Sequence, residues 1–110
     1  MIIDTNENIS IITQEKVTVI ELVKKIEALY PKFENQHIIV QLTSLKTIVL
    51  EDVIEFLRLS KLHKGANKSF VIVSNTFDIS LSPDEIIVVP TRQEAKDVIE
   101  MEDMERDLGI

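Results

Sequence analysis

The distribution of apolar and polar positions divides the chain into short strands and longer helices. Ile2 and Ile3, and then the stretch 9–13, are β-branched segments separated by polar residues typical of turns, so they predict two short strands. Three further apolar runs predict strands. The first two indicate buried strands, and the first shows no alternation, which is typical of a central strand that is covered on both faces. These runs span residues 37–42, 69–74 and 86–89.

Helical spacing predicts a first helix between the second and third strands. Thr18 and Glu21 have the spacing of a capping box, in which a hydroxyl and a carboxylate satisfy backbone N–H groups. Pro31 ends the helix because it has no N–H group to donate. The apolar face, which we expect to cover the sheet, consists of Val19, Leu22, Val23, Ile26, Leu29 and Tyr30.

Two further helices are predicted. Residues 50–64 have a broad apolar surface, and Gly65 directly after them suits a left-handed C-terminal cap. Thr91 and Glu94 have capping-box spacing at the start of the last helix. Its inward-facing positions are Ala95, Val98 and Ile99. Between these helices, residues 82–85 predict a single turn at most.

The resulting order, β-β-α-β-α-β-β-α, predicts one α/β domain over residues 1–110. We expect a mixed, mostly parallel sheet of four or five strands with three main helices. The strand–helix–strand succession around the second helix predicts parallel strands. Residues 100–110 form an acidic helical extension at the C-terminus.

Charge and composition narrow the function. The net charge is −7 and there are no cysteines, so disulfides, thiolate metal sites and cysteine nucleophiles are excluded. An acidic domain binds nucleic acid poorly, and the local basic cluster is explained by its place at a helix C-terminus. That cluster consists of Lys61, His63, Lys64 and Lys68. Without a signal peptide or a long apolar run, we expect a cytoplasmic protein that does not enter membranes.

No catalytic or metal motif is evident. His37 opens a buried strand and His63 lies in the last turn of a helix, but neither belongs to a metal-ligand motif. With two glycines, a glycine-rich phosphate loop is excluded. We therefore expect a non-enzymatic chain with no cofactor and no metal.

A partner-binding site is predicted around the loop that follows the third strand, because ligands gather at the carboxyl ends of strands in open α/β sheets. Thr43, Ser44 and Thr47 supply hydroxyls there, either for contact or phosphorylation or merely as turn formers. Glu51 and Asp52 follow in the first turn of the second helix, where helix-dipole compensation also explains them.

The middle of the chain resembles the STAS domain of bacterial anti-sigma factor antagonists. Residues 38–43 are similar to the strand that precedes its helix, residues 53–57 to that helix, residues 69–74 to the next strand, and residues 91–95 to the start of its last helix. The likeness covers about residues 9–100. It implies a STAS-like fold and a regulatory protein partner, such as an anti-sigma factor.

One departure from that family concerns its phosphoacceptor serine. Where the family has Asp-Ser-Ser-Gly, this chain has Val49-Leu50-Glu51-Asp52, so Glu51 takes the place of the serine. The usual switching by a kinase is therefore not expected at this position. A permanent negative charge there would resemble the phosphorylated serine.

The C-terminal third also resembles a family of short bacterial proteins that genomes often label ribonuclease Z. The likeness covers residues 88–91, 93–95 and 99–109. The label implies a metal-dependent hydrolase that processes transfer RNA, but the H-x-H-x-D-H zinc motif of true ribonuclease Z enzymes is missing from this chain. We expect the label not to describe its chemistry.

The preferred hypothesis is thus a non-catalytic interaction module, and the alternative is a metal-dependent transfer RNA nuclease. The apolar residues among the acids of the C-terminal extension either dock in a partner's groove or complete the core. They are Met101, Met104, Leu108 and Ile110. Binding of a small ligand stays open.

Overall fold

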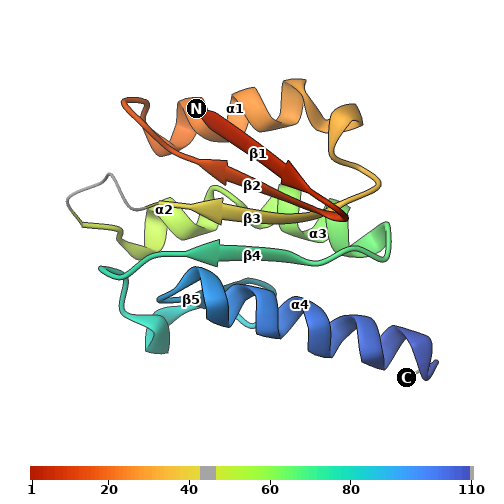
Figure 1. Cartoon of the computed structure of the whole chain (residues 1–110). Helices are drawn as coiled ribbons and strands as arrows, with labels where there is room; N and C mark the ends of the chain where they lie inside the picture. The colour runs from red at the N-terminus through yellow and green to blue at the C-terminus, as the bar shows by residue number, and fades with distance from the viewer. Residues whose placement is uncertain (43–46, 110) are drawn as a thin grey trace.

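The computed structural model describes residues 1–42 and 47–109. Five strands, four α-helices and two short 3-10 helices lie in this part of the chain (Figure 1). The strands are β1 (Ile2–Asn6), β2 (Ile9–Thr13), β3 (His37–Gln41), β4 (Phe70–Val73) and β5 (Ile87–Val89). The helices are α1 (Val19–Ala28), η1 (Tyr30–Lys32), α2 (Leu50–Ile54), α3 (Leu57–Gly65), η2 (Ile79–Leu81) and α4 (Arg92–Asp107). No helix among the described residues is long and apolar enough to cross a lipid bilayer.

The strands form one mixed sheet in the order β1-β2-β3-β4-β5. β1 pairs antiparallel with β2, and the other neighbours pair in parallel. Parallel neighbours need a crossover connection, which α1 and the α2–α3 pair supply. The predicted α/β class and the mixed, mostly parallel sheet are thereby confirmed. The register aligns Ile12, Val40, Ile72 and Val88 in one row across four strands.

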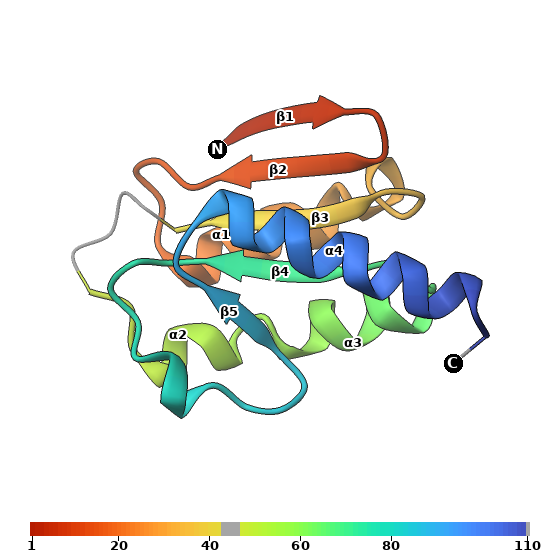
Figure 2. The same ribbon diagram turned by 60° about the horizontal axis from the view of Figure 1, so that its bottom comes forward.

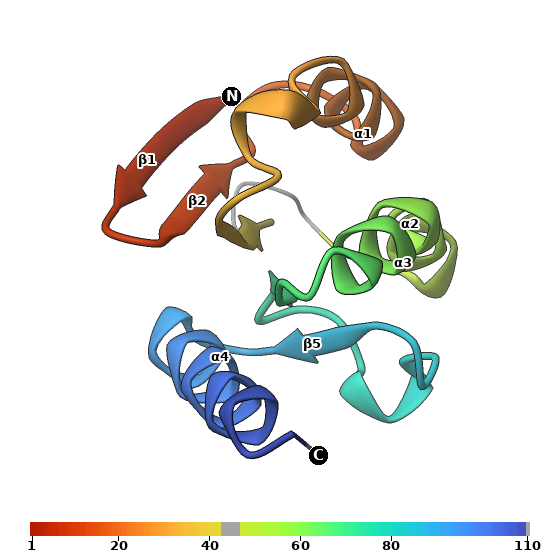
Figure 3. The same ribbon diagram turned by 90° about the vertical axis from the view of Figure 1, so that its right-hand side faces the viewer.

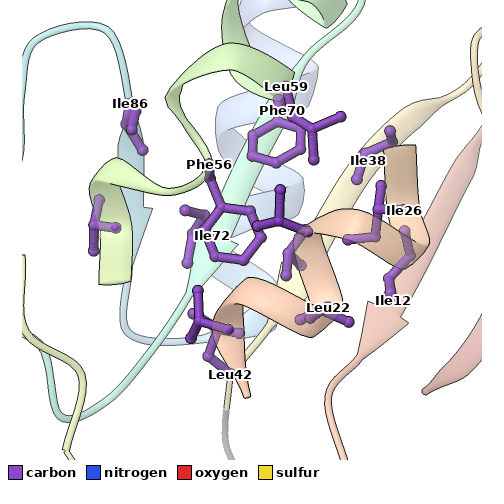
Figure 4. Close-up of a cluster of buried hydrophobic side chains, with 14 of the residues drawn as sticks. Ile12, Leu22, Ile26, Ile38, Leu42, Phe56, Leu59, Phe70, Ile72 and Ile86 are labelled. Carbon is purple, nitrogen blue, oxygen red and sulfur yellow. The ribbon is translucent and has the colours of Figure 1, made fainter. Parts of the chain in front are cut away.

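The larger core lies between this row and the helices α1, α2 and α3. Figure 3 shows these helices on one side of the sheet and α4 on the other. Leu22 and Ile26 of α1 are fully buried against the sheet, as are Phe56 and Leu59 from the second crossover (Figure 4). The rings of Phe56 and Phe70 lie with their centroids 6.2 Å apart. Four residues of the apolar face predicted for α1 are confirmed as buried, Val19, Leu22, Val23 and Ile26, whereas Leu29 and Tyr30 lie beyond the end of the helix and are partly buried.

A smaller core lies under α4. Ala95 and Ile99 of α4 are buried against the opposite row of the sheet, which includes Ile39 and Val71. α4 contacts β3, β4 and β5, while β1 lies at the edge of the sheet, beyond β2 and not covered by α4 (Figure 2). All five residues of β1 are exposed. β3 and β4 are thus buried on both faces, as their uninterrupted apolar runs predict, and the middle of β2 also contributes to both cores.

The predicted first strand is too short. β1 continues to Asn6 instead of ending at Ile3, and the turn is limited to Glu7 and Asn8. Asn6 pairs with Ile9, so the hairpin has a two-residue connection. Glu7 adopts a left-handed conformation with φ of 54° there, which two-residue hairpin turns require.

The single helix predicted over residues 50–64 is in fact two helices. The chain tightens at Phe56, whose N–H donates to the carbonyl of Val53, three residues back, at 3.0 Å. This break turns Phe56 fully into the core and leaves Ile54 exposed. The predicted cap at Gly65 is also wrong, because Gly65 ends α3 and Asn67 is the left-handed residue, with φ of 63°.

The segment before β5 contains the predicted turn and one more. The N–H of Ile86 donates to the carbonyl of Pro83 at 3.1 Å, which closes a turn over the predicted residues. The additional turn is η2, whose start is capped by the Asp78 carboxylate accepting from the N–H of Ser80 at 3.0 Å. The sequence does not predict η2, because no run of apolar residues at helical spacing follows Asp78.

Phe56 is the side chain on which the packing of the second crossover depends. We expect Phe56→Ala to lower the free energy of unfolding by about 3–5 kcal/mol, since it leaves a cavity between two helices and the sheet. Leu62→Ala on the exposed side of α3 is the control, with an expected change within about 0.5 kcal/mol. Urea unfolding followed by circular dichroism measures both, and equal effects would contradict the assignment.

Candidate functional site

The structure places three of the five predicted partner-binding residues, Thr47, Glu51 and Asp52, near the carboxyl ends of β3 and β4. Thr43 and Ser44 lie outside the described residues. Thr47 is exposed just before α2, Glu51 is exposed in its first turn, and Asp52 beside it is half-buried. The three described residues therefore share one short stretch of surface.

Hydrogen bonds to neighbouring segments fix this stretch in place. The N–H of Ile48, a buried residue, donates to Thr76 Oγ1 at 3.1 Å. The N–H of Val49 donates to Asp52 Oδ2 at 3.0 Å, so Asp52 caps the start of α2. Thr76 belongs to the loop after β4, and the stretch is thus tied to the loops after two adjacent strands. Asp52 acts here as a structural residue, whereas Glu51 is exposed and forms no ion pair with any other residue that the structure describes.

Exposed apolar side chains border this stretch. Ile20 is 52% exposed, Val49 48% and Ile54 45%. Ile20 and Ile54 line one shallow groove between α1 and α2, together with Lys24 and Glu55. We call Ile20, Thr47, Val49, Glu51 and Ile54 the α1–α2 surface. The groove that Ile20 and Ile54 line also contains four charged side chains, and a mixture of apolar contacts and charges is typical of protein interfaces.

Sequence reasoning missed the apolar part of this surface. Ile54 fits the inward face of one continuous helix, and only the break at Phe56 turns it outward. Ile20 does carry a signal, because it lies off the apolar face of α1 between Val19 and Glu21. At the edge of the groove, Arg58 Nε donates to Glu27 Oε2 at 2.9 Å and joins α3 to α1.

A second group of polar residues lies at the opposite end of the sheet and centres on His37. Its Nδ1 accepts a hydrogen bond from the backbone N–H of Ser69 at 2.9 Å. Its Nε2 lies 3.0 Å from Asp103 Oδ2 of α4. Because Nδ1 is occupied as an acceptor, the neutral ring carries its proton on Nε2 and donates it to Asp103.

The same residues attach α4 to the start of β4. Ser69 Oγ donates to Glu102 Oε1 at 2.5 Å and accepts from Arg106 at 2.9 Å. Arg106 also donates to Asp103 Oδ1 at 2.9 Å. We call His37, Ser69, Glu102, Asp103 and Arg106 the α4 network. No sequence pattern predicts this network, because its members lie as far apart as residues 37 and 106.

His63 belongs to the interior and not to the basic surface cluster that the sequence predicts. It is fully buried, its Nε2 lies 2.6 Å from the carbonyl oxygen of Gln36, and its Nδ1 lies 2.7 Å from the hydroxyl of Tyr30. A carbonyl oxygen only accepts, so Nε2 carries the proton and Tyr30 donates to Nδ1. His63 thereby ties the end of α3 to the segment before β3.

Burial has the largest effect on both histidines. It lowers the pKa of His37 below the ordinary value, against the raising effect of Asp103 and with small lowering effects of Lys68 and Arg106. It likewise lowers the pKa of His63, against the raising effect of the Gln36 carbonyl. Both rings are therefore held in the neutral form.

These contacts give the α4 network a structural role. Ser69 Oγ directs its proton to Glu102, while His37 accepts the backbone N–H of the same serine, so the imidazole does not activate the hydroxyl. Within the described residues, no group of three or more His, Asp or Glu side chains is arranged to hold a metal ion. The network joins β3, β4 and α4.

No protein-family model matches this chain, and no curated protein matches it.

The contrast between Asp52 and Glu51 is testable. We expect Asp52→Ala to lower the free energy of unfolding by about 1 kcal/mol, because it leaves the N–H groups at the start of α2 without a cap. Glu51→Ala, one residue away on the same helix, should change it by less than about 0.5 kcal/mol. Urea unfolding at neutral pH compares the two, and the reverse order would refute the assignment of the cap.

The buried histidines predict loss of stability in mild acid. Their pKa values are lowered in the folded chain, so near the ordinary value of about 6.5 the unfolded chain binds more protons. The free energy of unfolding therefore rises with pH. The stabilising contribution of the two neutral histidines is fully present above about pH 6.5 and is lost as the pH falls below that value. Urea unfolding at several values between about pH 5.5 and 7.5 measures this slope.

The double variant His37→Gln/His63→Gln provides the control, because glutamine retains one donor and one acceptor in each position. We expect a lower overall stability and a nearly flat dependence on pH in this range. A slope as steep as that of the unaltered chain would show that other groups cause it.

Proposed function

We propose that the chain is a non-catalytic protein-interaction module that binds a regulatory partner through the α1–α2 surface. The observation that carries this proposal is that Ile20 and Ile54 are exposed and line one groove between α1 and α2, while Val49 is exposed at the start of α2. Single exposed apolar residues are common on protein surfaces. A group of them drawn from two helices, with charges around it, is characteristic of an interface.

The rigidity of this surface supports the proposal. Its backbone is held by the contact between Ile48 and Thr76 and by the Asp52 cap, and the buried Val53 and Phe56 lie directly beneath it. A surface that is already ordered before binding loses little conformational entropy when a partner docks. The same surface lies at the carboxyl edge of a parallel sheet, where open α/β folds place their binding sites.

The resemblance to STAS domains is the basis for proposing which class of protein the partner belongs to. In that family the start of the corresponding helix carries the phosphoacceptor serine, and Glu51 occupies this position here as an exposed carboxylate. We propose a cytoplasmic, anti-sigma factor antagonist-like protein whose partner is an anti-sigma factor or a related regulator. The fixed charge of Glu51 would keep its surface in the state that phosphorylation gives in the family.

The experiment compares binding by matched variants. The tagged full chain is used to purify partners from cells of its source, and recovery is quantified by mass spectrometry for the unaltered chain and for Ile20→Asp/Ile54→Asp. We expect recovery of the specific partner to fall at least about tenfold, since a buried carboxylate at an apolar contact is costly. The interaction is then measured by calorimetry with the two purified proteins.

Leu62→Asp is the matched control, because Leu62 is an equally exposed apolar residue on α3 outside this surface. It should leave recovery unchanged. A partner retained equally by both variants would contradict the proposal. Metal analysis and an RNA-cleavage assay on the same preparation test the transfer RNA nuclease alternative, which stoichiometric metal together with turnover would establish.

A further inference from the structure

The C-terminal half of α4 has an apolar side that faces away from the protein. Met101, Met104 and Leu108 are 62%, 60% and 72% exposed. Their spacing of three and four residues places them in one line along the helix, on the side opposite the buried Ile99. The methionines therefore do not complete the core, which was one of the two roles expected from the sequence.

The α4 network determines that this side faces outward. Glu102, Asp103 and Arg106 occupy the side of the helix nearest the sheet and bond to His37 and Ser69. Turning the methionines inward would break these contacts and leave buried polar groups without partners, which is costly. The outward orientation is thus part of the fold.

Acidic residues flank the apolar line on both sides. At 100° per residue, Glu100 and Asp107 lie along one side of it and Glu105 along the other, and all three are exposed. Within residues 97–109 the one basic residue is Arg106, which is bound to Asp103 and Ser69 on the inner side. The outward side is therefore apolar and negatively charged.

We propose that this side of α4 binds a basic amphipathic helix of another protein. Met101, Met104, Leu108, Glu100, Glu105 and Asp107 form this surface, which we call the α4 stripe. Methionine side chains are flexible and polarisable and suit adaptable apolar contacts. Lysine or arginine residues beside the apolar face of the partner pair with the flanking carboxylates, and they supply specificity and steering.

The negative charge of the α4 stripe argues against two other binding partners at this surface. A second copy of the chain would bring its own acidic flanks against these, and like charges in an interface are unfavourable. Anionic lipid headgroups would be repelled in the same way. The inference extends beyond the proposed function, since the α4 stripe and the α1–α2 surface lie on helices that cover opposite faces of the sheet (Figure 3).

The test uses a synthetic basic amphipathic peptide as the probe, acetyl-LKKLLKLLKKLLKL-amide carrying a fluorophore. Binding to the full chain is followed by fluorescence anisotropy at several salt concentrations. A peptide of the same composition, scrambled so that its leucines do not share one helical face, is the control. We expect saturable one-to-one binding of the amphipathic peptide that weakens with salt, and at least tenfold weaker binding of the scrambled peptide, about the effect of losing a central apolar contact.

Variants locate the binding site. Met101→Gln/Met104→Gln/Leu108→Gln leaves the charge unchanged and should weaken binding at least about tenfold. Glu100→Gln/Glu105→Gln/Asp107→Asn should reduce both the affinity and its dependence on salt. Ile20→Gln/Ile54→Gln, on the α1–α2 surface, should bind the peptide as the unaltered chain does. Circular dichroism confirms that each variant is folded before its affinity is interpreted.

Several results would overturn the inference while leaving the α1–α2 surface untouched. They are the absence of saturable binding, equal affinity for the scrambled peptide, and unchanged affinity of the triple glutamine variant. Sedimentation that shows a dimer which this variant abolishes would assign the α4 stripe to a second copy. Co-sedimentation with phosphatidylcholine–phosphatidylglycerol vesicles that the variant abolishes would assign it to a membrane.

Discussion

The burial of β3 and β4 on both faces is the constraint on which the rest of the structure depends. Residues such as Val40 and Ile72 point to one side and Ile39 and Val71 to the other, and all four are fully buried. Each side needs its own cover, since exposing either row would lose roughly 1.5–3 kcal/mol for every side chain returned to water. The crossovers necessarily supply α1, α2 and α3 to one side, so α4 has to cover the other. The apolar contact between α4 and the sheet is small, because Ala95 and Ile99 are the only buried residues of this helix.

The α4 network compensates for this small apolar contact. Beyond Ile99 the inward side of α4 is polar, and it meets His37 and Ser69, two buried polar residues at the amino ends of β3 and β4. Buried groups of this kind are costly without hydrogen bonds. Here each finds a partner on α4, so the polar requirements of two strand ends and of one helix are met together. The neutral form of His37 belongs to this arrangement, because protonation would place a second N–H group against the backbone N–H of Ser69.

Sequence patterns predicted the structural features that depend on residues close together in the chain. They did not predict the features that depend on contacts between residues far apart in the chain. The caps at Thr18 and Thr91 are present, with each hydroxyl accepting from the N–H three residues on, and the parallel strands follow from their uninterrupted apolar runs. The break at Phe56 was not predictable, because a continuous helix and two short helices would bury similar residues. The observed arrangement packs Phe56 against Phe70, which is distant in the sequence.

The same holds for the candidate site. Its position at Thr47, Glu51 and Asp52 came from the sequence, whereas its apolar part requires α1 and α2 to lie side by side. The α4 network joins His37 to Asp103 across 66 positions, and no spacing rule reaches so far.

The two proposed surfaces are joined by one rigid element. β3 contacts α4 at both ends: at the carboxyl end the Gln41 side chain accepts two hydrogen bonds from Arg92, at 2.9 and 2.6 Å, and at the amino end His37 bonds to Asp103. These contacts hold β3 at both ends, and both of its faces are buried. Coupling between distant sites requires an element with two arrangements whose balance each ligand shifts. Because α1 and α2 lie on one face of the sheet and α4 on the other, partners at the two surfaces do not obstruct each other. We therefore expect the two proposed partners to bind independently, so that the domain would bring them together without transmitting a conformational signal between them.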